Sequence, residues 1–209
     1  MPRALGQIDV RKSEAILDAA SEVLSERGLG ASVEEIARRA GVSKQTVYNH
    51  FGGREDILRA LAARRSSAVT ASLSEPGAAE DPETALYGFA RELLEAVTAS
   101  RYAQVMRLTI LSAAEHPELA EVVFSAGPAN SRRRLAEFLA EEHRAGRLRV
   151  EDPAMAAEFF AGMAVGTRQL QALLTLGAPD EAEIERRARG CAAVFMRAYA
   201  PVHPPAANR

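Results

Sequence analysis

The segment SVEEIARRAGVSKQTVYNHF, residues 32–51, contains two short helical patterns joined at a glycine. The letters SVEE predict a capping box, in which the Ser32 hydroxyl accepts from the Glu35 amide and the Glu35 carboxylate reaches back to Ser32. Gly41 supplies a left-handed turn at little steric cost, and Ala37 is small where the two helices cross. Two helices joined by a short turn that contains glycine form a helix-turn-helix unit.

The second helix of this unit has one thin apolar side and one broad polar side. Val47 and Phe51, four residues apart, share the inward face. A recognition helix needs this division, because one face packs on the core and the other enters a DNA groove. Lys44 suits phosphate or guanine, Gln45 suits adenine, and the hydroxyl and imidazole groups suit phosphate oxygens. The predicted DNA-contact residues, which include two helix N-termini, are Ser32, Ser43, Lys44, Gln45, Thr46, Tyr48, Asn49, His50 and Arg54. A solvated polar surface shows the same pattern, so geometry alone leaves both interpretations open.

The charge distribution agrees with a partner that meets only the first part of the chain. The 209 residues carry a net charge of −2, but residues 1–65 hold 11 basic and 9 acidic side chains, while the remainder holds 15 and 19. This asymmetry is weak evidence for a polyanion at the front end. The single cysteine excludes an internal disulfide, and no apolar leader or membrane-length segment is present. We expect a cytoplasmic protein.

The whole chain reads as helical, with glycine and proline between the periodic segments. We expect helices near residues 10–27, 32–41, 43–52, 54–72, 82–99, 101–115, 117–126, 129–145, 152–176 and 180–199, with Asp152 and Asp180 capping the last two. The segment LSEPGAAEDPE, residues 73–83, is the clearest linker. The predicted fold is therefore all-α. A three-helix helix-turn-helix domain and its connecting helix occupy residues 1–72, and a larger helical domain occupies residues 73–209.

The segment SVEEIARRAGVSKQTVYNHFGGREDIL, residues 32–58, closely resembles the DNA-binding region of the TetR family of transcriptional regulators. The shared features are a hydroxyl residue opening the second helix, then IA, AGVS, a threonine, Y, HF and a basic residue. Arg54 stands where lysine is usual and Gly53 replaces the usual serine. The resemblance spans about residues 10–65, and residues 116–163 look like the AefR-like class of C-terminal domains. It implies a homodimer on a palindromic operator, usually a repressor released by a small ligand.

The segment 155–176 is apolar on most sides, which suggests that it packs against a second subunit as well as its own core. Small residues on it would allow a close approach, and the last helix offers a matching apolar face. The predicted dimer-interface residues are Ala157, Ala161, Ala164, Ile184, Ala188, Cys191 and Phe195. The alternative is that this segment is the central helix of a monomeric bundle.

An effector pocket, if the family pattern holds, lies between helices of residues 82–176. The candidate lining residues are Tyr87, Phe89, Met106, Phe124, Phe160, Met163 and Arg168. Each apolar member is more often plain core, and an interface ion pair or solvent exposure is more common for a residue such as Arg168 than contact with an anionic ligand. We expect a bound ligand to tilt the connecting helix and so to change the spacing of the two recognition helices.

No catalytic or metal-binding pattern accompanies these features. The four histidines lie far apart in the chain, and no nucleotide loop, nucleophile elbow or ligand cluster is visible. We therefore expect no enzyme activity, no metal and no cofactor. A regulator without an effector, constitutive or activating, is the main alternative. A small helical enzyme is a weaker one, because it would need an acid/base or nucleophilic group that the sequence does not display.

Overall fold

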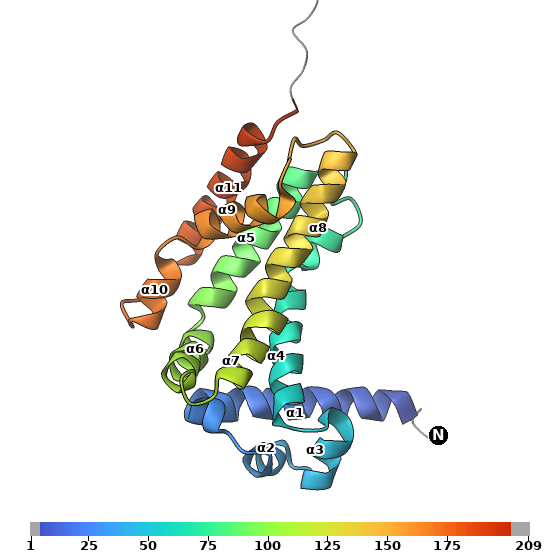
Figure 1. Cartoon of the computed structure of the whole chain (residues 1–209), viewed down its shortest axis with the longest axis vertical. Coiled ribbons are helices and arrows are strands. Elements are labelled where there is room, and N and C mark those ends of the chain that lie inside the picture. The colour runs from blue at the N-terminus through green and yellow to red at the C-terminus, as the bar shows by residue number, and fades with distance from the viewer. Residues whose placement is uncertain (1–4, 202–209) are drawn as a thin grey trace, which may run out of the picture. The chain divides into compact units, whose positions relative to one another are not determined.

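The computed structural model describes residues 5–201, with side chains from Val10 onward, and these residues form helices and connecting turns without a β-strand (Figure 1). Packing divides the chain into two compact units. One contains the residues up to Arg65 together with Ser100–Pro128, and the other contains Ser66–Ala99 and the residues from Ala129 onward. The expected all-α class is confirmed. The sequence-based boundary at residues 72 and 73 remains a prediction about independently folding domains.

The first unit is built on the long helix α1. Its elements are α1 (Leu5–Arg27), the 3-10 turn η1 (Gly28–Gly30), α2 (Val33–Ala40), α3 (Lys44–Phe51), the first three turns of α4 (Arg54–Val69), α6 (Ser100–Ser112) and α7 (Pro117–Phe124). Its core combines apolar side chains from α1, α2, α3, α4 and α7: Ile16, Leu17, Ala20, Val23, Leu24, Ile36, Ala37, Val47, Ile57, Leu58, Leu119 and Val122. Because α2 and α3 share this core with α1, the helix-turn-helix unit is fixed to a larger helical scaffold.

The backbone at Gly28, just after the end of α1, lies close to Leu108 of α6. Gly28 has a φ of 60°, a conformation that favours glycine. A Cβ atom built on Gly28 would lie 2.6 Å from the Cβ of Leu108 on α6. Both the turn and the α6 contact therefore require glycine at this position.

The second unit is a separate helical bundle. Its elements are the end of α4, η2 (Ala71–Ser74), α5 (Pro82–Thr98), α8 (Asn130–Arg144), α9 (Pro153–Val165), α10 (Arg168–Leu173) and α11 (Glu181–Ala198). A π-helical turn, Ser125–Ala129, connects α7 to α8. The Asp152 and Asp180 carboxylates accept from the amides of Met155 and Glu183, which confirms both predicted caps.

An aromatic series forms the centre of this second bundle. The ring centroids of Phe89 and Phe160 lie 6.0 Å apart, and those of Phe160 and Phe195 lie 5.1 Å apart in an edge-on arrangement. Tyr199 stacks on Phe195 with its ring centroid 4.2 Å away. These four residues tie α5, α9 and α11 into one core.

The single helix predicted over residues 152–176 is wrong, because the chain breaks at Gly166 into α9 and α10. Gly166 has φ 50° and ψ −131°, a conformation that side-chain-bearing residues rarely adopt. The Arg187 guanidinium on α11 donates to the carbonyl oxygens of Ala164 (2.6 Å) and Met163 (3.0 Å) at the end of α9. These bonds satisfy helix-terminal carbonyls that would otherwise lack partners within the helix.

Within residues 5–201, no helix combines the length and the apolar character needed to cross a membrane.

Candidate DNA-binding surface

The capping box at the start of α2 is present as predicted. The Glu35 amide donates to the Ser32 hydroxyl over 3.2 Å, and the Ser32 amide donates to the Glu35 carboxylate over 3.1 Å. The bond from the Ser32 amide is the main cause that lowers the pKa of Glu35. At the other end, Gly41 adopts the left-handed conformation with φ 67° and ψ 29°. Both ends of α2 are therefore defined by local sequence.

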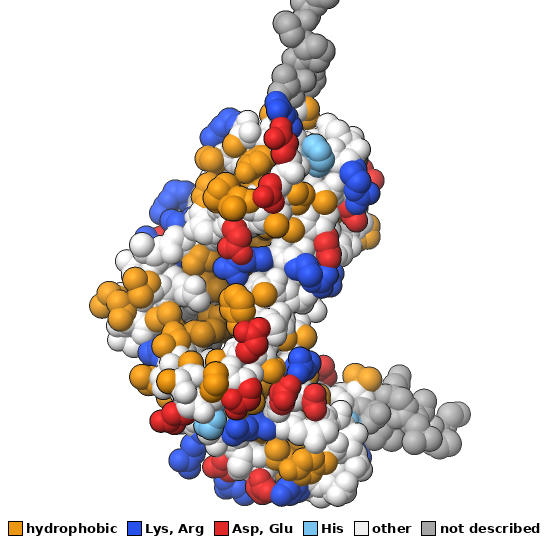
Figure 2. All heavy atoms as spheres, in the orientation of Figure 1, with side chains coloured by type: hydrophobic (Ala, Val, Ile, Leu, Met, Phe, Trp, Pro, Cys, Tyr) orange, Lys and Arg blue, Asp and Glu red, His pale blue; other side chains and the backbone are white. Residues whose placement is uncertain are grey.

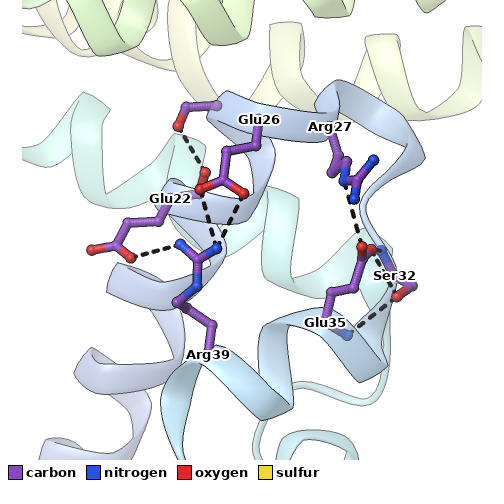
Figure 3. Close-up of polar contacts among 7 residues, drawn as sticks. Glu22, Glu26, Arg27, Ser32, Glu35 and Arg39 are labelled. Carbon is purple, nitrogen blue, oxygen red and sulfur yellow. Dashed lines mark hydrogen bonds and ion pairs between the residues drawn. The ribbon is translucent and has the colours of Figure 1, made fainter.

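Ion pairs hold α2 against α1 (Figure 3). Arg39, in the last turn of α2, reaches back to Glu22 over 3.0 Å and to Glu26 over 3.1 Å. Arg27 lies 3.5 Å from Glu35, close to the capping box. These groups are exposed, so they contribute more to the orientation of α2 than to stability. The sequence reasoning missed Arg39, although acids four residues apart on α1 offered a signal.

The recognition helix α3 also has a defined start and a thin buried face. The Thr46 amide donates to the Ser43 side chain over 3.0 Å, which makes Ser43 the N-cap. Val47 is fully buried and Phe51 is partly buried, as predicted. The helix ends at Gly52, whose φ is 71°. Nearly all the other side chains of α3 remain outside the core.

The polar face of α3 is organised by contacts among its own side chains. Lys44 forms an ion pair with Glu34 of α2, and its ammonium nitrogen lies 5.6 Å from the centroid of the Tyr48 ring. Beside these residues, the Gln45 amide donates to the Asn49 side chain one turn further along α3, over 2.8 Å. All of these residues are exposed. The sequence reasoning did not include Glu34, because its pairing with Lys44 depends on how α2 and α3 cross.

The remaining predicted DNA-contact residues lie at the edge of this surface. His50 is partly buried, and its Nδ1 atom lies 2.9 Å from the Ser13 hydroxyl of α1. Arg54 is partly exposed at the first position of α4. The Ser32 and Ser43 hydroxyls are already engaged as helix caps. All nine predicted residues belong to the first unit, and their contacts with DNA remain predictions.

The predicted effector residues do not form a single group. Phe89 and Phe160 are core residues of the second unit, and Met163 packs against that core. Met106 and Phe124 belong to the first unit, where Phe124 is largely exposed.

The two polar candidates for effector contact have partners within the second unit. Tyr87 donates to Glu185, which raises the pKa of Tyr87, and the Arg189 guanidinium lies 4.9 Å from its ring centroid. Arg168 pairs with Glu183 and donates to Gln171 over 2.7 Å. This pair lies within one chain, whereas the ion-pair alternative considered for Arg168 was a pair at an interface.

An open pocket of about 350 Å³ lies elsewhere in the second unit, where the start of α9 meets the end of α11. Its lining residues are Arg149, Glu151, Asp152, Met155, Ala156, Phe159, Ala198, Tyr199 and Ala200. None of them was predicted to contact an effector. The pocket depends on the crossing of two helices distant in sequence, so helical periodicity alone offered no signal for it.

The predicted dimer-interface residues all lie inside the subunit. Each of the seven is at most 7% exposed, and all but Ala161 and Ile184 belong to the core cluster of the second unit. The exposed large apolar side chains on α9, α10 and α11 and at the C-cap of α10 are different ones: Met155, Phe159, Leu170, Leu174 and Val194. Figure 2 shows hydrophobic side chains over α9 and α10 on the face in view. Assignment of the seven buried residues to a dimer interface remains a prediction.

No group of histidine, cysteine and acidic side chains within residues 5–201 has the arrangement of a metal site.

Comparison with known proteins agrees with the geometry of the helix-turn-helix unit. Residues 16–61 match the family model of bacterial regulatory proteins of the tetR family, and residues 84–201 match that of the AefR-like transcriptional repressor C-terminal domain. These two matches define a helix-turn-helix transcriptional regulator. The chain belongs to the TetR family, whose members are regulators of transcription and not enzymes.

Individual relatives support the same assignment. SrpR, a helix-turn-helix transcriptional regulator of Pseudomonas putida, is 43% identical over 53 residues, so the match spans only a quarter of either chain. A TetR-family regulator from Mesorhizobium loti has a TM-score of 0.71 and 27% identity, with 92% of this chain and 98% of that chain covered. The flavonoid-responsive regulator FrrA has a TM-score of 0.69 and 30% identity, with 92% and 99% covered.

Proposed function

We propose that the chain represses transcription by binding a palindromic operator as a homodimer. The observation that carries this proposal is the outward face of α3, where Lys44, Gln45, Tyr48 and Asn49 are exposed. Only Val47 of this helix is fully buried. A helix that contributes so little to the core is best explained by a binding partner, here DNA, on its outer face. The dimensions and polar groups of α3 suit the major groove.

Roles within this surface follow from side-chain chemistry. The bonded pair of Gln45 and Asn49 leaves a carbonyl oxygen and an amide nitrogen for one base edge, and adenine presents the complementary donor and acceptor. The Tyr48 hydroxyl suits a phosphate oxygen. We expect Gln45→Ala to relax preference at one operator position. We expect Tyr48→Ala to weaken binding to specific and random duplexes alike. A uniform loss for Gln45→Ala would show that Gln45 does not read sequence.

The decisive experiment is selection of bound duplexes from a random DNA pool by the purified protein, followed by sequencing. We expect an enriched palindrome whose half-sites lie about 34 Å apart or somewhat more, since each recognition helix occupies one major groove. The Tyr48→Ala variant serves as the matched protein control. Absence of enrichment at low salt would contradict the proposal.

The dimer proposal rests on the exposed apolar surface of α9, α10 and α11, and not on the buried residues behind it. Phe159 is 60% exposed, whereas its neighbour Phe160 is fully buried. Apolar side chains gathered on adjacent helices indicate a protein interface. Phe159→Glu is therefore expected to convert dimers into monomers in sedimentation experiments. Leu111→Glu, at an exposed site of the first unit, is the matched control. A dimer that persists in Phe159→Glu would place the interface elsewhere.

Release by a small ligand is the remaining part of the proposal. It is supported by the AefR-like match over the second part of the chain and by the similarity to FrrA, which is named as flavonoid-responsive. Planar phenolic compounds of the flavonoid class are the first ligands to titrate against the protein bound to its selected duplex. Displacement would support ligand control. Failure of these and other small molecules to displace DNA would favour the constitutive alternative. We also propose that the protein acts in the cytoplasm, where a regulator of transcription would meet chromosomal DNA.

A further inference from the structure

The carboxylate of Glu34 occupies an unusual place for a protein surface that meets DNA. Glu34 lies in the first turn of α2, is exposed, and pairs with Lys44, the first residue of α3. The centroid of the Tyr48 ring lies 5.6 Å from the same ammonium nitrogen. Lys44 is the only lysine or arginine within α3. The one permanent cation of the recognition helix is therefore paired with an acid before any DNA arrives.

Local structure does not account for this pair. The start of α2 is already capped by Ser32 and Glu35, and an exposed ion pair contributes little to folding. An acid in the first turn also favours the helix dipole, but that effect requires no lysine partner. An exposed glutamate is ionised at neutral pH, and the hydrogen bond with the Lys44 ammonium is the main cause that lowers the pKa of Glu34 further. Two opposite charges thus face the position that DNA would occupy.

We propose that Glu34 is a specificity-determining residue, which weakens binding to random DNA by retaining Lys44 and repelling phosphate. This inference rests on the proposed DNA-binding function. On random DNA, Lys44 must leave Glu34 to reach a phosphate, and the carboxylate then faces a polyanion without a partner. On the operator, a base amino group in the major groove takes the place of Lys44 at the carboxylate. The cost therefore falls mainly on non-specific complexes.

The effect is measurable with Glu34→Gln, which keeps the side-chain shape and removes the charge. We expect this variant to bind a random-sequence duplex about three- to tenfold more tightly at low salt, with a salt dependence steeper by about one phosphate contact. Affinity for the selected operator should change less, so that discrimination falls. Glu137→Gln is the matched control, because Glu137 forms a comparable exposed ion pair with Arg133 in the second unit.

The experiment measures binding by the fluorescence anisotropy of labelled random and selected duplexes. The proteins compared are the wild type, Glu34→Gln, Glu137→Gln, Lys44→Gln and the double variant that carries both Glu34→Gln and Lys44→Gln. Thermal melts establish that each variant is folded. Removing Lys44 should reduce the gain caused by Glu34→Gln, because only the repulsion between the carboxylate and phosphate then remains. The inference would be overturned if Glu34→Gln and Glu137→Gln bound random DNA equally well. It would also be overturned if the gain caused by Glu34→Gln were just as large in the protein that lacks Lys44. Wild-type protein that bound no duplex would instead refute the proposed function itself.

Discussion

Val47 is the only fully buried residue of α3, so its substitution tests how the recognition helix is held. Val47→Ala removes two methyl groups, and transfer of these groups accounts for about 1.6 kcal/mol. The cavity that remains raises the expected loss in the free energy of unfolding to about 2–3 kcal/mol. Phe51 and the Ser43 cap still hold the helix ends, so we expect a loosened α3 within a folded protein.

The assay combines denaturant unfolding at fixed protein concentration with hydrogen exchange of the α3 amides. Val10→Ala is the matched control, because Val10 is 62% exposed on α1 and its truncation should cost less than about 0.5 kcal/mol. Faster exchange in α3 and weaker DNA binding should accompany Val47→Ala. Equal stability of the two variants would refute the conclusion that Val47 anchors the recognition helix.

Three further predictions concern local features. Gly28→Ala should destabilise the protein by about 1–3 kcal/mol in thermal denaturation, because of its positive φ and the nearby Leu108 Cβ; Gly30→Ala, whose added Cβ meets no atom within 4 Å, is the control. Ser43→Ala should cost about 1 kcal/mol and weaken DNA binding, because it removes the α3 cap; unchanged melting would argue against that cap. Burial raises the pKa of the Cys191 thiol, so less thiolate exists at pH 8 and alkylation of the native protein should be slow. One thiol should be modified rapidly after denaturation. Rapid labelling of the native protein would contradict the burial of Cys191.

The helix-turn-helix unit could be predicted because its decisive interactions are local. The Ser32 and Glu35 bonds span three residues, and the Gly41 turn depends on its own backbone freedom. Val47 and Phe51 lie on one face through helical periodicity alone. The same reasoning did not find the partner of Lys44, because Glu34 is ten residues away on another helix. Such a pair depends on how two helices cross.

Burial on a helix face does not by itself distinguish a core from an interface. Ala157, Ala161 and Cys191 were placed between subunits because an apolar helix has more sides than a small bundle seems to need. The structure buries all three within one chain, while Phe159 and Leu170 remain exposed. Periodicity identifies apolar residues, but only the packing partners show which of them are already covered.

The sequence by itself determined the all-helical class, the capped helix-turn-helix and the membership that its motif implies, since each depends on residues within a few positions of one another. Tertiary structure decided where α9 ends. Apolar periodicity continues through residues 152–176, yet Gly166 breaks the helix and Arg187, 21 residues further along, bonds the freed carbonyl groups. The permissive glycine is visible in the sequence, but the distant side chain that makes the break favourable is not.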